Sequence, residues 1–170
     1  MELIISPAIS LDGFIADVNG ECYNWILPAD EARYEAELLS VGCELIGRKT
    51  YELRKDYYDA RTHIFTFVYT SQHFDDKEKV KFVHGTPNFV LDTIEKQFGF
   101  NKVIACGGGE TLGAFAAAGL VTEIYFSIHP IILGAGVRLF GSYKPELNLK
   151  LIDIDTNITG VTRTHYLVIK

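Results

Sequence analysis

The sequence predicts an α/β fold: a mixed, mainly parallel sheet with helices on both faces and an antiparallel C-terminal end. From Glu2 to Ala118, short runs of β-branched and aliphatic residues alternate with segments of helical periodicity, as in βα units. From Leu120 onwards, apolar and polar residues alternate as they do in antiparallel strands. The chain has 170 residues without a repeat or linker, which predicts one domain over residues 1–170.

The elements are expected in the following order. Strands are predicted over residues 2–8, 43–46, 64–69, 80–83, 102–105, 123–133, 147–155 and 160–169. Helices are predicted over residues 29–41, 88–98 and 112–118, with a short helix after Thr50. The first helix has apolar residues at Ala32, Ala36 and Leu39 and acidic residues in its first turn. The connection over residues 10–27 is rich in turn residues, and a loop this long in one domain is usually functional.

Composition excludes several classes of protein. The net charge is −6, and the 16 basic residues are scattered, which argues against a nucleic-acid-binding face. The apolar segment 124–140 is broken by His129 and Pro130, so no membrane span is expected, and the N-terminus lacks a signal-peptide pattern. The five histidines show no metal-ligand spacing. Cys22, Cys43 and Cys106 form no C-x-x-C pair and suit a reducing cytoplasm.

Three consecutive glycines, Gly107 to Gly109, lie between a predicted strand and a predicted helix. The N-terminus of a helix carries unpaired N–H donors and a partial positive charge, and glycine lets a ligand lie against the backbone. These properties predict a pyrophosphate site, although a tight turn without a ligand is the alternative. The spacing of Gly107, Gly109 and Gly113 does not fit Gly-x-Gly-x-x-Gly, so a nucleotide fold other than the Rossmann type is expected.

Two other predicted strands end in polar loops, at residues 47–50 and 70–72. If the strands are parallel, these loops and the glycine loop emerge at the same carboxyl edge, where ligands bind in open α/β sheets. Thr50 can add a hydroxyl to the pyrophosphate site. Arg48 and Ser71 can hold a further phosphate, such as the 2′-phosphate of NADP.

Four segments together resemble a known family: Ser10–Ala16, Gly47–Glu52, Cys106–Leu112 and Pro130–Gly136. The chain resembles the dihydrofolate reductase-like fold family, in the branch of the C-terminal reductase domain of bifunctional riboflavin-biosynthesis proteins. The resemblance implies NADPH as the hydride donor and a homodimer that pairs through the C-terminal strands. It also implies a pyrophosphate loop of the kind that often has a cis Gly–Gly bond, so Gly107 or Gly108 is expected in a cis or positive-φ conformation. Ile124, Phe126, Ile128, Ile131 and Leu133 are the apolar residues expected to be exposed there.

The resemblance also implies which residues contact the cofactor. The segment Asp12–Ala16 matches the loop that closes over the nicotinamide. The implied cofactor contacts are Ala8, Ile15, Gly47, Arg48, Lys49, Thr50, Thr70, Ser71, Gln72, Cys106, Gly107, Gly108, Gly109, Glu110, Thr111 and Leu112.

For the substrate, the resemblance implies contacts from Asp12, Trp25, Arg33 and Ser127. Trp25 and Asp30 are the catalytic candidates. As a catalytic acid, Asp30 would lie in an apolar pocket with a raised pKa; as a helix-end carboxylate, which we favour slightly, it would be exposed. Trp25 is equally a core aromatic. The chain departs from the riboflavin-type pattern because Cys106 stands where those reductases carry an acid before the glycine loop.

The resulting expectation is a cytoplasmic, homodimeric NADPH-dependent reductase of a heterocyclic substrate. It resembles 5-amino-6-(5-phosphoribosylamino)uracil reductase of riboflavin biosynthesis. Two alternatives stay open at this point: dihydrofolate reductase-like reduction of a pterin, and an NADP-binding protein without catalysis. Turnover of NADPH with a panel of substrates separates them.

Overall fold

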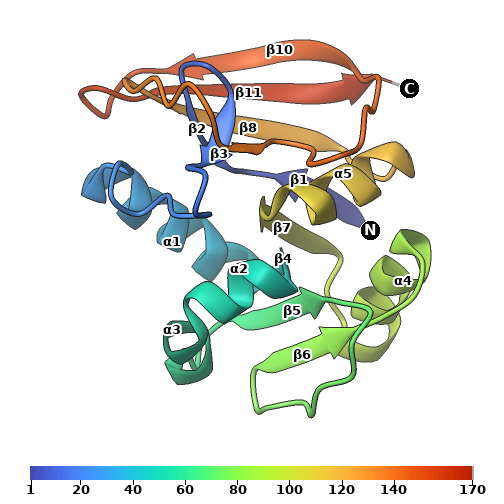
Figure 1. Cartoon of the computed structure of the whole chain (residues 1–170). Coiled ribbons are helices and arrows are strands. Elements are labelled where there is room, and N and C mark those ends of the chain that lie inside the picture. The colour runs from blue at the N-terminus through green and yellow to red at the C-terminus, as the bar shows by residue number, and fades with distance from the viewer. Residues whose placement is uncertain (170) are drawn as a thin grey trace.

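A computed structural model describes residues 1–169 of the chain (Figure 1). Its strands are β1 (Glu2–Ile5), β2 (Ala8–Ser10), β3 (Phe14–Ala16), β4 (Cys43–Gly47), β5 (Phe65–Tyr69), β6 (Val80–Val83), β7 (Lys102–Gly107), β8 (Glu123–His129), β9 (Val137–Arg138), β10 (Asn148–Asp155) and β11 (Thr162–Ile169). Its helices are α1 (Pro28–Val41), α2 (Arg48–Leu53), α3 (Lys55–Ala60), α4 (Pro87–Phe98) and α5 (Gly109–Ala117). Within residues 1–169, no helix is long and apolar enough to span a membrane.

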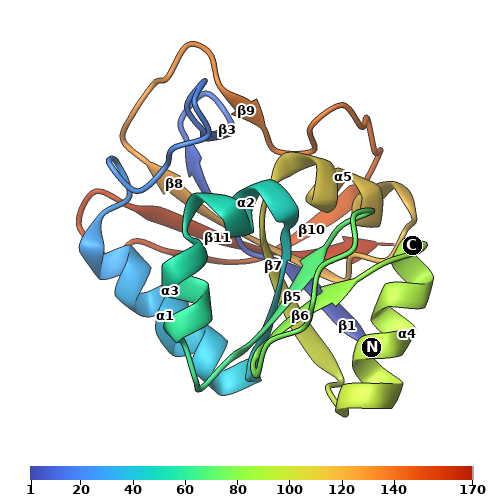
Figure 2. The ribbon, with the colours of Figure 1, turned by 60° about the horizontal axis from the view of Figure 1, so that its bottom comes forward.

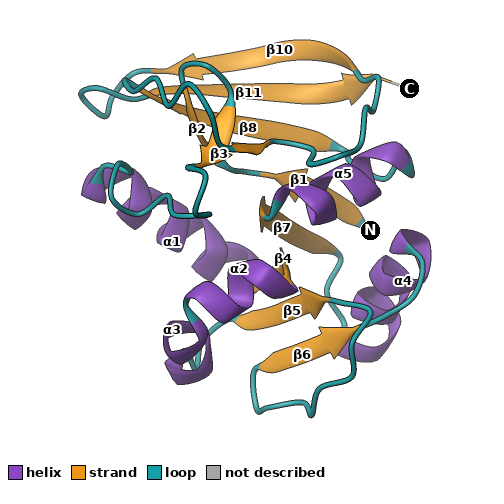
Figure 3. Ribbon diagram, viewed as in Figure 1, coloured by secondary structure: helices purple, strands orange, loops and turns teal. Residues whose placement is uncertain are grey.

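The main sheet has the strand order β10-β11-β8-β1-β7-β4-β5-β6, and β2 also pairs with β8 (Figure 3). The pairs among β1, β7, β4, β5 and β6 are parallel, as are those of β8 with β1 and β2. In the main sheet, the antiparallel pairs are β11 with β8 and β10 with β11. The predicted fold class, a mainly parallel sheet with an antiparallel C-terminal end, is confirmed.

Helices cover both faces of the sheet, with α1, α2 and α3 on one side and α4 and α5 on the other (Figures 1 and 2). The alternation of side chains along β1 divides the core in the same way. Leu3 and Ile5 pack into the cluster that contains residues of α4 and α5, whereas Ile4 packs with Leu38 of α1. Burial on both faces explains why these strands are apolar throughout.

The structure differs from the predicted elements in several places. Helix α2 begins at Arg48, within the polar loop expected over residues 47–50, and a second short helix, α3, follows it. The strand expected over residues 102–105 continues to Gly107. The strand expected over residues 2–8 is divided into β1 and β2. The strand expected over 123–133 ends at His129, because Pro130 follows and lacks the N–H needed to continue a ladder. Helix α5 begins at Gly109 rather than residue 112, so the last of the three glycines is already helical. The short pair β3 and β9 was not predicted.

The segment that follows β9 packs directly against the backbone of α5. A Cβ placed on Gly113 would lie 2.3 Å from the carbonyl oxygen of Phe140 and 2.7 Å from the ring of Tyr143. The Glu110 carboxylate accepts hydrogen bonds of 2.8 and 2.7 Å from the backbone N–H and the hydroxyl of Ser142. Close backbone contact therefore requires glycine within this helix.

Replacing Gly113 with alanine tests this contact, because the contact decides whether the free energy of unfolding rises or falls. In an unconstrained helix interior, Gly→Ala stabilises by about 0.5–1 kcal/mol. Here the added methyl group meets backbone atoms, so Gly113→Ala should lower the free energy of unfolding by about 1–3 kcal/mol. Urea denaturation measures the change, and an unchanged or increased stability would contradict the packing.

Candidate functional site

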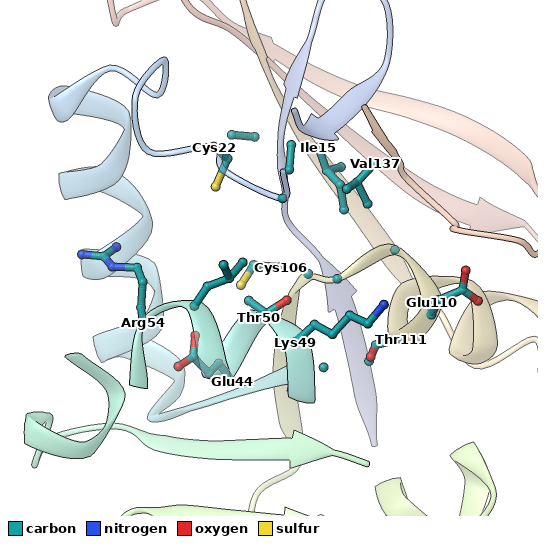
Figure 4. A pocket seen from close by; sticks show the side chains of 18 of the residues that line it. Ile15, Cys22, Glu44, Lys49, Thr50, Arg54, Cys106, Glu110, Thr111 and Val137 are labelled. Atoms are coloured by element: carbon teal, nitrogen blue, oxygen red, sulfur yellow. The ribbon is translucent and has the colours of Figure 1, made fainter. Parts of the chain in front are cut away.

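A cavity of about 940 Å³ lies at the carboxyl ends of β4, β5 and β7. Its wall includes residues from all three strand-end loops: Gly47–Thr50, Thr70 with Ser71, and Cys106–Thr111. The sequence-based expectation that these loops meet at one edge is therefore confirmed. Figure 4 shows Lys49, Glu110 and Thr111 on one side of the cavity and Cys22 and Arg54 on the other.

The glycine loop presents bare backbone to this cavity. The peptide bond between Gly107 and Gly108 is cis, as the resemblance implied. Helix α5 begins directly after Gly108, and no side chain caps its first N–H groups. Cβ atoms on Gly107 and Gly108 would meet only Thr50, with closest contacts to its hydroxyl at 3.6 and 3.1 Å. The loop thus offers uncapped donors and open space, which suit a pyrophosphate.

Two cations of α2 stand at this side of the cavity. Lys49 is exposed, extends toward Thr111 in Figure 4, and has no ion-pair partner among residues 1–169. Arg48 pairs with Glu52 through contacts of 2.7 and 2.6 Å. This pair is partly exposed, and such surface pairs contribute little free energy, so an incoming phosphate can compete for Arg48.

Most predicted cofactor contacts lie on the cavity wall. They are Ala8, Ile15, Gly47, Arg48, Lys49, Thr50, Thr70, Ser71, Cys106, Gly107, Gly108, Gly109, Glu110 and Thr111. The other two do not line it. Leu112 is fully buried in the main core, because it points from α5 toward the sheet, and Gln72 is an exposed loop residue just beyond Ser71.

Asp30 lines the cavity and is only 4% exposed, so the favoured expectation of an exposed helix-end carboxylate is wrong. Its carboxylate accepts hydrogen bonds from Arg33, from Ser127 at 3.1 Å and from His129 at 2.9 Å. Burial raises the pKa of Asp30, but these partners outweigh burial and hold the pKa below its usual range. The raised pKa expected of a catalytic acid is therefore also wrong.

Three predicted substrate contacts lie off the cavity wall, whereas Ser127 lines it. Arg33 binds Asp30, Ser127 and Asp155, so its role is to hold Asp30 rather than to face the cavity. Trp25 is half-buried and packs its ring edge-on against His129, with centroids 5.4 Å apart. Asp12 instead accepts hydrogen bonds from the N–H groups of residues 133 and 134, which joins two loops.

Sequence reasoning missed the side of the cavity between α1 and α3. Its wall includes Cys22, Tyr23, Glu44, Tyr57, Tyr58 and Arg163, together with Tyr34 of α1. These residues come from five separate segments and share no motif. The one available signal was the adjacent pair Tyr57–Tyr58 in a short helix beside the Gly47 loop.

Comparison with known proteins agrees with this geometry. Residues 2–162 match the model of the family described as the RibD C-terminal domain. The uncharacterised protein YyaP of Bacillus subtilis is 27% identical over 176 residues, covering 96% of this chain and 93% of that protein. A Shewanella sp. PV-4 structure, whose name assigns it provisionally to riboflavin biosynthesis, is 26% identical with a TM-score of 0.84, and both chains are covered completely.

A dihydrofolate reductase from Enterococcus faecalis, solved in complex with NADP(H), has a TM-score of 0.70 at 15% identity, with 99% of this chain and 97% of that chain covered. At that identity the likeness concerns the fold alone. The family match, in contrast, is a match of the sequence itself, and it covers residues 2–162. The chain therefore belongs to the RibD C-terminal domain family.

Proposed function

We propose that the protein is an NADPH-dependent reductase of a small heterocyclic substrate with a pyrimidine- or pterin-like ring. One observation carries the proposal: the three strand-end loops, each suited to a phosphate, line a single cavity. The fold supports it, since a dihydrofolate reductase of this fold is described with NADP(H) bound.

Different residues of the cavity wall would hold different parts of the cofactor. The N–H groups at the start of α5 would hold the pyrophosphate, with the Thr50 hydroxyl and the Lys49 ammonium beside them. Arg48 and Ser71 would hold the 2′-phosphate. Ala8 and Ile15 would contact the nicotinamide, near the point where β2 and β3 approach the cavity.

NADPH supplies the hydride when it is bound. The protein's part is to orient the two rings and exclude water. Asp30 stays ionised at neutral pH because its pKa is lowered, so it acts as a positioning carboxylate and the proton comes from water. NADPH oxidation with aminopyrimidine, dihydrofolate and small carbonyl panels tests the proposal; cofactor binding without any turnover would contradict it.

The cofactor preference follows from Arg48. A charge-assisted contact with phosphate is worth about 1.5–3 kcal/mol, so Arg48→Ala should weaken NADPH binding about 10- to 100-fold and leave NADH binding nearly unchanged. Glu52→Gln frees Arg48 and should strengthen NADPH binding. Cofactor fluorescence titration measures both, with the exposed Lys55→Ala as the control for lost charge. Equal losses for the two cofactors would contradict the assignment.

Asp30 should also determine part of the acid sensitivity of the fold. Asp30→Asn leaves His129 without its carboxylate partner and leaves Arg33 with only the Asp155 carboxylate, 3.6 Å away, which should cost about 1–3 kcal/mol of stability at pH 7. Because the pKa of Asp30 in the folded protein lies below its usual value of 3.8, this contribution is complete well above that pH and is lost as pH falls through the folded pKa.

Urea denaturation of the Asp30→Asn variant and the wild type from pH 7 to pH 3 measures this difference. The exposed Asp153→Asn is the matched control and should change stability by less than about 0.5 kcal/mol. A stability difference that disappears between pH 7 and pH 5 would show a raised pKa and contradict the account.

The proposal also includes the oligomeric state of the protein and its place in the cell. None of the five apolar residues expected to be exposed is exposed. Ile124 is 1% exposed and belongs to the core, and Phe126, Ile128, Ile131 and Leu133 are partly buried. A group of exposed apolar residues lies instead on the edge strand β10 and on β11: Leu149, Leu151, Ile152, Ile154, Leu167 and Ile169. An apolar edge strand favours pairing with a second copy, so we propose a homodimer. The three cysteines are free, which favours the cytoplasm.

Light scattering at micromolar concentration should therefore give about twice the 19.0 kDa chain mass. Ile154→Glu, at a position 54% exposed on β10, should shift the mass to that of one chain. Leu39→Glu is the control, because Leu39 is 60% exposed but lies on α1. A wild-type mass near one chain would refute the dimer.

A further inference from the structure

One half of the cavity is built from aromatic hydroxyls and thiols. We call it the substrate half and define it by Cys22, Tyr23, Tyr34, Tyr57, Tyr58 and Cys106. In Figure 4, Cys106 lies at the boundary of this half. Cys22 and Arg54 are on one side of it, and Lys49 and Thr111 are on the other. These groups come from the loop before α1, from α1, from α3 and from the end of β7.

The substrate half offers neutral groups. Burial raises the pKa of the Cys22 and Cys106 thiols to about 11 and raises those of Tyr34 and Tyr58 well above the usual value, so all four are protonated at neutral pH. The Tyr34 hydroxyl is buried beside the Cys106 thiol, and it has no hydrogen-bond partner of good geometry among the described residues. A buried polar atom left unpaired costs free energy, so a ligand atom that bonds to it gains affinity.

The cations deep in this half are already paired. Arg61 contacts the buried Glu44 carboxylate and lies 3.7 Å from Glu35. Arg163 contacts Glu37 at 2.6 Å. Because the carboxylates neutralise these two guanidinium groups, neither offers a free positive charge to a substrate.

The remaining cation of this half, Arg54, is held on three sides. Its guanidinium packs over the rings of Tyr23 and Tyr57, at 3.9 and 4.3 Å from their centroids, and lies 3.5 Å from the Glu31 carboxylate. The ion pair is as exposed as that of Arg48 with Glu52 and would not by itself exclude a phosphate, but within residues 1–169 Arg48 has no such pair of rings around it. The unpaired cation is on the opposite side of the cavity, at Lys49, beside the glycine loop.

We propose that the substrate half binds an uncharged planar ring compound with a C=N or C=O group, and not a phosphate ester. The tyrosine rings provide flat apolar contact, and the Tyr34 hydroxyl donates to a polar atom at the ring edge. A dianionic phosphate would be desolvated beside Asp30, Glu31 and Glu35 without a free cation to compensate.

This inference rests on the proposed function, which supplies the reductant. A hydride passes from NADPH to the ring carbon of the C=N or C=O group, and water donates a proton to the nitrogen or oxygen. The products are NADP⁺ and the reduced ring. No group leaves, so no phosphate or sugar is needed on the substrate for the reaction to balance.

The test compares two ligands that differ only in a phosphate: 5-amino-6-ribosylaminouracil and its 5′-phosphate. Each is titrated calorimetrically into the protein saturated with NADP⁺. We expect the unphosphorylated compound to bind at least about 10-fold more tightly. Equal or tighter binding of the phosphate, or no binding of either compound, would overturn the inference while leaving the proposed function intact. Failure of NADP⁺ itself to bind would instead overturn the proposed function, and this inference with it.

Two variants test the physical reason. Tyr34→Phe removes the unpaired hydroxyl and should weaken binding of the unphosphorylated ring about 5- to 10-fold without changing NADP⁺ affinity. Tyr166→Phe is the matched control, because Tyr166 lies on β11 outside the cavity, and it should change neither affinity. Glu31→Gln frees Arg54 and should strengthen binding of the 5′-phosphate several-fold. An unchanged affinity in Tyr34→Phe, or no gain for the phosphate in Glu31→Gln, would contradict the inference.

Discussion

The parallel pairing of β4 with both β5 and β7 is the constraint on which the site depends. It brings three strand ends to one edge, and a register shift in the β4–β7 pair refines their placement. Ile46 pairs with Gly107, whereas Leu45 pairs with Ala105, so Cys106 is an extra residue in β7. Such an irregularity redirects a side chain. It sets Cys106 partly exposed on the cavity wall and lets the backbone of Gly107 and Gly108 face Thr50.

The two sides of this cavity differ in their electrostatic potential. Beside α5, uncapped N–H groups and Lys49 offer positive potential to a phosphate. Beside α1 and α3, charges are matched in pairs, such as Arg61 with Glu44, and protonated tyrosines fill the rest of the wall. The proposed dinucleotide and neutral ring would each lie in the environment that matches its charge, with Cys106 between them.

Local sequence predicted the features that local chemistry determines. The order of strands and helices, the strand-to-helix junction at Gly107 to Gly109 and the antiparallel C-terminal strands follow from runs of a few residues, although α5 begins at Gly109 rather than residue 112. Features that depend on distant partners were not predictable. Asp30 is buried because Ser127 and His129, about a hundred positions away, meet it across the sheet. β3 and β9 have three and two residues, too few to show a period. Gln72 and Leu112 were implied by resemblance alone, and their side chains face away from the cavity.

A crystal structure of the protein with NADP⁺ tests the central claim most directly. The account predicts the pyrophosphate at the N-terminus of α5, the 2′-phosphate beside Arg48 and Ser71, and the nicotinamide ring turned toward Cys106 and the tyrosine-lined half of the cavity. A cofactor bound in the reverse direction, with its adenosine among Tyr34 and Tyr58, or bound outside this cavity, would contradict the account.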